Sequence, residues 1–573
     1  MDKIYKKIIK LPRKFFSENL DITNWKNVEK ELKKLESESI NSVDDLILFL
    51  EKVSELSNIT GEESAQRYIK MTRFANEEKY ANQYNDFYKN IVAKCQPYYF
   101  KFDKKFYDSP FRQKLDSKKY AHLNKIIANS IELYREENIP LQVKERELAN
   151  KYGALFSKLT VIYKGEEKTL SQLAPLMKDK DRAIREEVWK LKMGKMAEKK
   201  VEFNALFDEM KELRIQQAKN AGFNNYRDYM HQSMGRFSYT PNDVMKFHDA
   251  VEKDVIPFLK KLTEKRKKVL NLDSVKPWDT SIDLDGKILK PFKTIDEFLN
   301  KGIEILHEIK PKFGENLGRM KASDLLDLEN RKGKAPGGYN YPLMETGAPF
   351  IFMNAVGLHG DVVTLLHEAG HAMHTFATKN INLGWYQDTP SEVAELASMG
   401  MEFISMDYWD KYYADEGDFK KAKRDQLEGA LSFLPWCMIV DNFQHWIYLN
   451  PEHTVAERDD YFIQLLKRFS TGVDWSNFAE YEKNIWLFQL HIFEIPFYYI
   501  EYGISQLGAL SIYKNYKKIG KEETLSNYEN FLELGYKVPV DKLYEAAGIK
   551  FDFSSKYVCE LVKFVEAELA KID

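Results

Sequence analysis

Helical periodicity is the feature of this sequence that most limits its fold. From residue 25 to residue 35, apolar residues recur every three or four positions with Lys and Glu between them, and Thr23 or Asn24 is placed to cap. Ser42 opens a second segment of this kind. Similar patterns cover residues 118–136, 201–221 and 243–270. They return after residue 361 and persist to the end of the sequence, so a mostly α-helical fold is expected.

Composition excludes several classes of protein. With 573 residues, of which 44% are hydrophobic and 14% aromatic, the chain can bury a large core, so disorder is not expected. The 86 Lys and Arg nearly balance the 88 Asp and Glu, which gives no support for binding nucleic acid or a charged membrane surface. Three scattered cysteines exclude a disulfide scaffold and a Cys-based zinc site, and they fit a reducing compartment.

Apolar runs are short throughout. No uninterrupted apolar segment follows the basic residues near Met1, so a secretory signal is not expected. The most apolar stretch, residues 430–440, is about half the length of a membrane-spanning helix and contains Pro435. A soluble cytoplasmic protein is the expectation.

Residues 331–354 interrupt the helical pattern with glycine, proline and aromatic residues. Phe350 to Met353 is predicted to form a short strand between turns. The segment is either an ordinary loop and hairpin or a backbone surface with which an extended ligand pairs, and the sequence favours neither.

A histidine cluster after this segment contains a metal-binding motif. His367 and His371 are four positions apart, so on a helix they project from one face and can bind one zinc ion. Glu368 is placed to take a proton from a water molecule at the metal. Asp361 is expected to cap this helix, and no proline interrupts residues 362–377. This is the H-E-x-x-H motif of zinc peptidases; the alternative is a helix with incidental histidines.

Two neighbouring histidines are less suited to metal binding. His359 is expected to precede the helix, and His374 is rotated by about 60° from His371. A structural or substrate-contacting role is expected for both.

A catalytic zinc site needs a third protein ligand and one open position. Glu392 follows Thr389 by three residues, the spacing of a capping box, with Pro390 in the first turn. Glu395 lies among apolar residues, where a buried carboxylate needs a strong partner such as zinc. Glu395 is therefore the predicted ligand and Glu392 its main rival. Glu402, two turns further on, is assigned either to a supporting or to a surface role.

These motifs resemble the M3 family of zinc oligopeptidases, most closely its oligoendopeptidase F and Pz-peptidase branch. The resemblance rests on His367-Glu-Ala-Gly-His371-Ala-Met-His374, followed by Glu395 24 residues after His371, and covers residues 337–508 in motif detail. It implies a two-lobed helical zincin-like metallopeptidase with a deep central channel and a small β element near the active site. It also implies that His367, His371 and Glu395 hold one Zn²⁺ per chain and that Glu368 is the general base and acid.

A second set of candidate functional residues lies between residues 491 and 503, where His491 is followed by three tyrosines. Tyr498 and Tyr502 are four positions apart and are predicted to share a helix face, although Pro496 precedes them. An aromatic core stripe is the usual origin of such a pattern. A Tyr O–H or His N–H can instead stabilise an oxyanion, and the resemblance implies substrate or transition-state contacts for His491 and for Tyr498 or Tyr502.

The predicted function is a zinc metallo-endopeptidase that cleaves short unfolded peptides, with Gly338, Tyr339 and Asn340 pairing with the peptide backbone. One alternative is a zinc carboxypeptidase or dipeptidyl carboxypeptidase, which needs an Arg or Lys for the substrate carboxylate. The other is a non-catalytic, peptide-binding helical protein with a structural metal, which the absence of nearby Cys disfavours. No nucleic-acid or membrane partner is expected, and the chain is either a monomer or a homo-oligomer. Residues 1–185 are predicted to form an N-terminal helical wall and residues 186–573 the catalytic region.

Overall fold

The computed structural model describes residues 5–335 and 337–572, and this part of the chain is mostly helical, as predicted. Two compact units divide it, each made of three separate stretches of sequence. The first unit comprises Met1–Tyr134, Leu289–Lys423 and Gly508–Phe551; the second comprises Arg135–Ile288, Arg424–Leu507 and Asp552–Asp573. Among the described residues, no helix is both long enough and apolar enough to cross a membrane.

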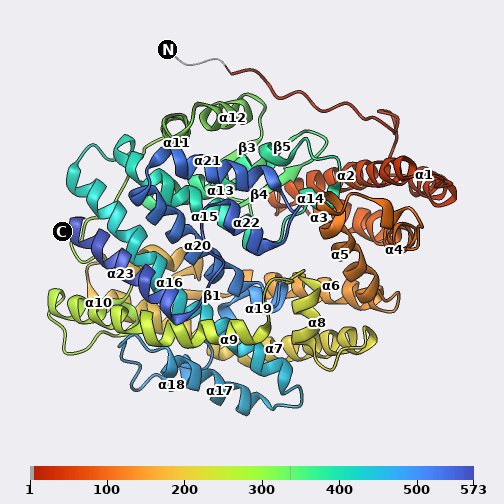
Figure 1. The fold of residues 1–573 in the computed structure, drawn as a ribbon. Coiled ribbons are helices and arrows are strands. Elements are labelled where there is room, and N and C mark those ends of the chain that lie inside the picture. The colour runs from red at the N-terminus through yellow and green to blue at the C-terminus, as the bar shows by residue number, and fades with distance from the viewer. Residues whose placement is uncertain (1–4, 336, 573) are drawn as a thin grey trace. The chain divides into compact units, whose positions relative to one another are not determined.

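The first unit is mainly helical, with one small sheet. Its N-terminal stretch contains α1 (Trp25–Ser37), α2 (Val43–Arg73), α3 (Glu78–Phe87), a π-helical turn (Tyr88–Val92), α4 (Ala93–Tyr107) and α5 (Ser117–Leu133). The middle stretch contains α11 (Ile295–Ile309), α12 (Pro311–Ala322), β3 (Leu326–Glu329), β4 (Tyr339–Leu343), β5 (Ala348–Ala355), α13 (His359–Thr378), α14 (Gly384–Gln387) and α15 (Ser391–Ser405). The last stretch adds α21 (Lys521–Leu534) and α22 (Val540–Ala546), which lie beside α13 and α15 (Figure 1).

Local signals start the first helices where the sequence predicts. The Asn24 side chain accepts a hydrogen bond from the backbone N–H of Lys26 at the start of α1. Ser42 caps α2 in the same way by accepting from the backbone N–H of Asp45. Both predicted helix starts are confirmed.

The sheet forms the β element of the first unit. Its strand order is β3-β5-β4, with β3 parallel and β4 antiparallel to the central strand β5. The strand predicted at Phe350–Met353 is confirmed as the buried centre of β5. Ala65 and Ile69 of α2 pack against the sheet with Leu343 of β4, so α2 supports one face of these strands.

Lys334 holds the segment between β3 and β4. Its buried ammonium donates to a carboxylate oxygen of Asp327, 2.9 Å away, and to the backbone carbonyls of Glu329 and Met353. Burial raises the pKa of Asp327, but hydrogen bonds from Arg331 and Lys334 outweigh this and hold it well below its usual range. Lys334 thereby fixes the start of the Gly- and Pro-rich segment to both β3 and β5.

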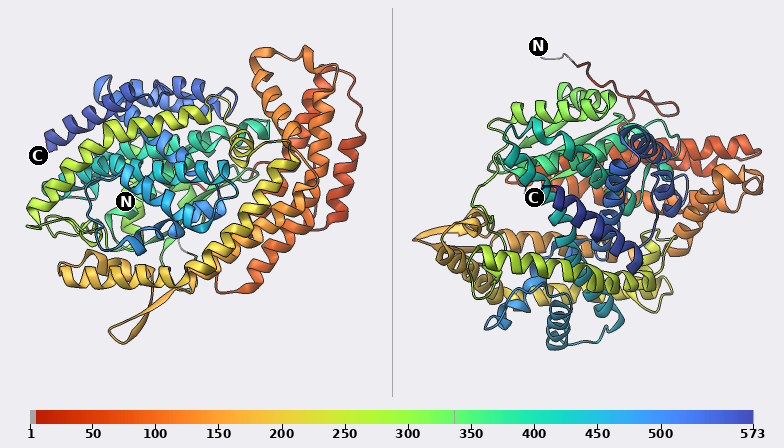
Figure 2. Two further views of the ribbon diagram at one scale, coloured as in Figure 1. Left: turned by 90° about the horizontal axis from the view of Figure 1, so that it is seen from below. Right: turned by 60° about the vertical axis from the view of Figure 1, so that its left-hand side comes forward.

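The second unit is also helical. Its N-terminal stretch contains α6 (Asn138–Ser157), β1 (Thr160–Tyr163), β2 (Glu166–Thr169), a 3₁₀ segment (Ser171–Lys178), α7 (Arg182–Asn220), α8 (Tyr226–Ser233), α9 (Pro241–Ala250), a π-helical turn (Val251–Val255) and α10 (Ile256–Val269). The later stretches contain α17 (Val455–Arg468), α18 (Ala479–Glu482), a 3₁₀ turn (Ile485–Phe488), α19 (Leu490–Glu494) and α23 (Ser555–Ile572). The boundary between the units falls within α16 (Glu416–Leu449) and α20 (Tyr499–Lys518). Figure 2 shows the β1–β2 hairpin standing out beyond the end of α6.

Candidate metal centre and active site

Helix α13 carries the H-E-x-x-H motif and begins directly after the sheet. The helix starts at His359, not directly after a cap at Asp361 as predicted, so His359 lies inside the helix. Asp361 still stabilises the N-terminus of the helix. One of its carboxylate oxygens accepts hydrogen bonds from the backbone N–H groups of Val356, Gly357 and Leu358 at 2.8–2.9 Å. The motif is therefore anchored to the end of β5.

Helix α15 crosses α13 at the motif. A Cβ atom placed on Gly370 would lie 2.5 Å from the carbonyl oxygen of Ala397 and 2.6 Å from Cα of Ser398. Only a residue without a side chain allows backbones to approach this closely. Gly370 thus permits the crossing that brings Glu395 of α15 to the two histidines of α13, a role that the sequence did not reveal.

The three predicted ligands converge. Glu395 Oε2 lies 3.4 Å from His367 Nε2 and 3.9 Å from His371 Nε2, and one donor atom from each residue lies within 4.8 Å of the others. Tetrahedral zinc with bonds of about 2.0–2.1 Å places its ligands about 3.3–3.5 Å apart. Two imidazoles and one carboxylate at these distances fit zinc and leave a fourth position for water or substrate.

Glu402 supports the first histidine. Its Oε1 lies 2.7 Å from Nδ1 of His367, which directs the other ring nitrogen towards Glu395. Burial lowers the pKa of His367, but the hydrogen bonds to Glu395 and Glu402 outweigh it and raise the pKa well above its usual value. His371 differs, because burial lowers its pKa to about 4. Of the two roles left open for Glu402, the structure favours the supporting one.

Glu368 is a buried carboxylate beside the ligand cluster. Only 5% of the residue is exposed, and its Oε2 has no hydrogen-bond partner among the described residues. Burial raises its pKa to about 7. A Cβ atom on Gly338 would lie 3.8 Å from the other carboxylate oxygen, and the Asn340 amide donates to the backbone carbonyl of Glu368 at 3.1 Å. The segment before β5 therefore borders this carboxylate.

Of the predicted substrate-binding residues, Gly338 and Asn340 lie beside Glu368, whereas the Tyr339 side chain turns towards the core. The Tyr339 hydroxyl is 2.6 Å from Thr72 Oγ1, and its ring stacks on Phe352 with centroids 4.8 Å apart. Strand β4 lies at the edge of the sheet and pairs with β5 alone among the described strands.

The predicted capping role of Glu392 is wrong. Pro390 occupies the N-cap position of α15, and no side chain caps that end. Glu392 is instead fully buried in the first turn, and its backbone carbonyl accepts a hydrogen bond from Tyr544. Neither His374, packed against Phe531, nor His359, paired with the Tyr413 hydroxyl at 2.7 Å, belongs to the ligand cluster.

His491 and the predicted tyrosines belong to the second unit, where they form one aromatic cluster. The His491 ring lies 5.9 Å from Tyr498 and 5.7 Å from Tyr502, centroid to centroid, and the two tyrosines are 5.2 Å apart. Pro496 separates α19 from α20, so Tyr498 precedes the helix that contains Tyr502, and the prediction that the two tyrosines share a helix face is wrong. The structure thus brings all three residues together.

Comparison with known proteins agrees with these observations. Residues 175–562 match peptidase family M3, and residues 15–134 match the peptidase M3 N-terminal domain. An oligoendopeptidase F homologue of Borreliella burgdorferi is 30% identical over 298 residues, which is 50% of this chain and 49% of that protein. The group B oligopeptidase PepB of Streptococcus agalactiae is 23% identical over 531 residues, covering 85% of this chain and 84% of PepB.

Comparison with solved structures indicates the same family as comparison of the sequences. The structure of Pz peptidase A with an inhibitor superposes with a TM-score of 0.90 at 26% identity, over 98% of this chain and 99% of that one. The predicted resemblance to the oligoendopeptidase F and Pz-peptidase branch is confirmed. With a family match over more than half of its length, the chain belongs to peptidase family M3.

Proposed function

We propose that this protein is a zinc metallo-endopeptidase that hydrolyses peptide bonds within short unfolded peptides. The observation that carries the proposal is the convergence of His367, His371 and Glu395 beside the buried carboxylate of Glu368, one oxygen of which has no hydrogen-bond partner in the part of the chain that the structure describes. Membership of a peptidase family favours this function over a non-catalytic helical protein. The names of the relatives, oligoendopeptidase F and oligopeptidase, support oligopeptide substrates and internal cleavage.

In this proposal the side chains of α13 and α15 have two roles, metal binding and proton transfer. His367, His371 and Glu395 would hold zinc, which as a Lewis acid lowers the pKa of water and polarises a peptide carbonyl. Glu368 accepts the proton of the attacking water and then donates it to the departing amine. Its buried position keeps bulk water from competing for that proton.

The substrate backbone is proposed to lie along β4. An edge strand offers its backbone N–H and C=O groups to an extended peptide whatever that peptide's side chains, which suits an enzyme of broad specificity. Gly338 leaves space beside Glu368, and Asn340 is held by the backbone of that residue. His491, Tyr498 and Tyr502 are proposed to contact the substrate. The division at residue 185 and the cytoplasmic location stay predictions.

Glu368→Gln is the direct test. The amide keeps the size of the side chain but cannot accept the proton, so cleavage of an internally quenched peptide should fall about 10²–10⁴-fold while bound zinc, measured by elemental analysis, stays at the wild-type level. Glu523→Gln, an exposed change on α21 of the same unit, should cleave normally. An undiminished rate in Glu368→Gln would remove Glu368 from the mechanism.

Product analysis tests internal cleavage. A peptide with blocked ends should be cut between internal residues, and a chelator should stop the cutting. Release of only one or two residues from a free C-terminus would favour the carboxypeptidase alternative instead.

A further inference from the structure

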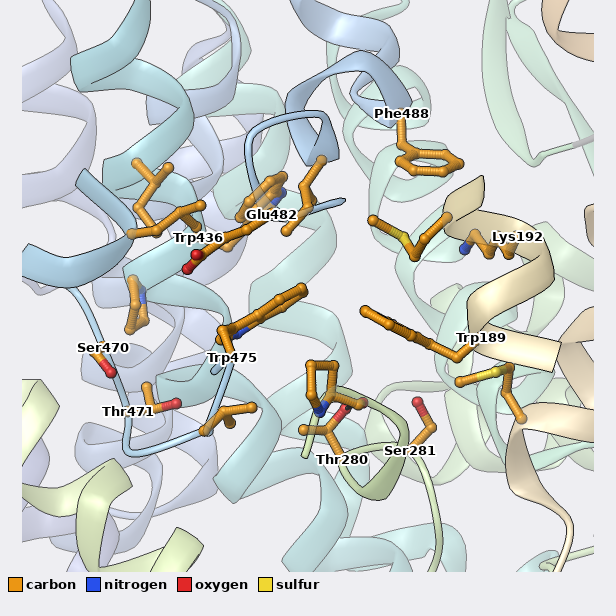
Figure 3. A pocket seen from close by; sticks show the side chains of 18 of the residues that line it. Trp189, Lys192, Thr280, Ser281, Trp436, Ser470, Thr471, Trp475, Glu482 and Phe488 are labelled. Carbon is orange, nitrogen blue, oxygen red and sulfur yellow. Dashed lines mark hydrogen bonds between the residues drawn. The ribbon is translucent and has the colours of Figure 1, made fainter. Parts of the chain in front are cut away.

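A large pocket in the second unit has no part in the function proposed above. Its volume is about 1150 Å³, and Figure 3 shows apolar and aromatic side chains around most of it. All of its lining residues belong to the second unit. The volume exceeds the usual size of a small-molecule site, about 300–1,000 Å³, so a ligand of several residues can enter.

Two tryptophans form one wall of the pocket. Trp189 of α7 and Trp475 face each other with ring centroids 5.7 Å apart and planes 60° apart (Figure 3). Trp278 supports Trp189 from behind at 5.4 Å. A wall of rigid aromatic rings contacts an aromatic or large apolar group with little loss of side-chain entropy.

Lys192 supplies a positive charge one turn along α7 from Trp189. Its Nζ lies 4.9 Å from the centroid of the Phe488 ring, and Figure 3 shows it reaching into the pocket. Lys192 makes no ion pair with any described residue, and burial lowers its pKa. A partly buried ammonium in aromatic surroundings gains more from an anionic partner than an exposed ammonium does.

The other charges favour an anion at this place. Lys178 and Lys467 also line the pocket, and Glu482 is the single acid among its described lining residues. In Figure 3 Glu482 lies on the Trp436 side, opposite Lys192. The local balance is therefore positive on the Lys192 side.

A hydrogen-bonded chain connects the pocket to the aromatic cluster of His491. Trp436, a lining residue, donates from Nε1 to Gln489 Oε1 at 2.9 Å, and Gln489 Nε2 lies 2.8 Å from His491 Nδ1. The proposed function assigns substrate contacts to His491. A pocket linked to this cluster by hydrogen bonds is suited to another part of the same peptide.

We propose that this pocket binds the C-terminal residue of a peptide, with the free carboxylate at Lys192 and an aromatic or large apolar side chain against Trp189 and Trp475. The choice of a peptide as the ligand rests on the proposed function. The binding itself requires neither zinc nor cleavage, so the two proposals can fail separately.

Peptide binding to the zinc-depleted full-length protein tests the proposal. The probe is acetyl-Ala-Ala-Phe with a free carboxylate, compared with its C-terminal amide, and binding is followed by tryptophan fluorescence and calorimetry. One partly buried charge-assisted contact is worth about a factor of ten in Kd, so the acid should bind about tenfold more tightly than the amide. Mass spectrometry after the titration confirms that the peptide is intact.

Lys192→Met locates the contact. The variant keeps most of the aliphatic stem, so it should lose the preference for the acid while binding the amide as the wild type does. Lys192→Gln serves as a second variant if the first folds poorly. Lys199→Met serves as the matched control, because Lys199 lies two turns further along the same helix, outside the pocket lining, and pairs with Glu202 at 3.3 Å; it should keep the full preference.

Each outcome bears on one proposal. The assignment of the pocket would be overturned if the acid and the amide bind equally, or if the preference for the acid survives in Lys192→Met. It would also be overturned if decanoate, a fatty acid with a carboxylate but no peptide group, binds more tightly than the peptide. If the preference is found but the zinc-loaded protein cleaves no peptide, the pocket assignment stands and the proposed function fails.

Discussion

At the residue scale, the geometry of the site depends on the contacts that the two ring nitrogens of His367 make. His367 has Nδ1 against Glu402 and Nε2 towards Glu395, so only Nε2 is available to a metal. Nδ1 of His371 has no such carboxylate partner among the described residues, and burial lowers the pKa of this histidine. Glu402 is therefore the residue that fixes the orientation and basicity of one ligand.

Glu402→Gln should weaken zinc binding without changing the fold. Supporting carboxylates of metal-bound histidines contribute about 10–100-fold to metal affinity, and the amide removes the charge while preserving the shape. Competition with a chromophoric chelator measures this affinity, with Glu523→Gln as the exposed control. Unchanged zinc affinity would show that Glu402 is only a packing residue.

At the element scale, single-helix patterns were predictable from the sequence, and contacts between helices were not. The caps at Asn24 and Ser42 and the spacing of the histidines depend on residues close in sequence, and the structure has them as predicted. The predicted start of α15 was wrong, because Pro390, not Thr389, occupies the N-cap position and Glu392 is buried.

The crossing of α13 and α15 shows why the rest could not be predicted. Gly370 has no special backbone conformation. The need for glycine at this position becomes evident only when Ala397 and Ser398 of the other helix are placed against it. The position of Glu395 and the choice between the roles of Glu402 both depend on this crossing. A helical period indicates which face is buried but not which helix covers it.

Gly370→Ala should separate the two helices. The added methyl group would meet backbone atoms at 2.5–2.6 Å, which neither helix can avoid by a side-chain rotation. A loss of about 1–3 kcal/mol in the free energy of unfolding is expected, together with weaker zinc binding because Glu395 moves away from the histidines. Urea unfolding and chelator competition measure the two effects.

The same helix provides the control. Gly360→Ala adds a methyl group that would meet no described atom within 4 Å beyond its chain neighbours and the backbone of its own helix, so it should be neutral or stabilise by up to about 1 kcal/mol. If both alanine variants lose the same stability, the cost does not come from the crossing.

At the scale of the whole molecule, the site belongs to a unit assembled from three distant stretches of chain. Tyr528 of α21 donates to the carbonyl of Ala397 at 2.5 Å, and α2 packs behind the sheet that precedes α13. The ligands themselves lie within residues 367–395, but their support comes from both earlier and later sequence. A metal that binds this site should therefore stabilise the unit, not just the motif.

Hydrogen exchange with and without zinc tests this coupling. At a free zinc concentration of 100 times Kd, binding adds about 2.7 kcal/mol, so amides that exchange through unfolding of the first unit should exchange about a hundredfold more slowly. The slowing should appear in α2, α13 and α21 alike, although they come from three separate stretches, and not in α7 or α9 of the second unit. His371→Ala should abolish it everywhere. Slowing confined to α13 and α15 would mean that the helices around the metal unfold independently of the unit that contains them.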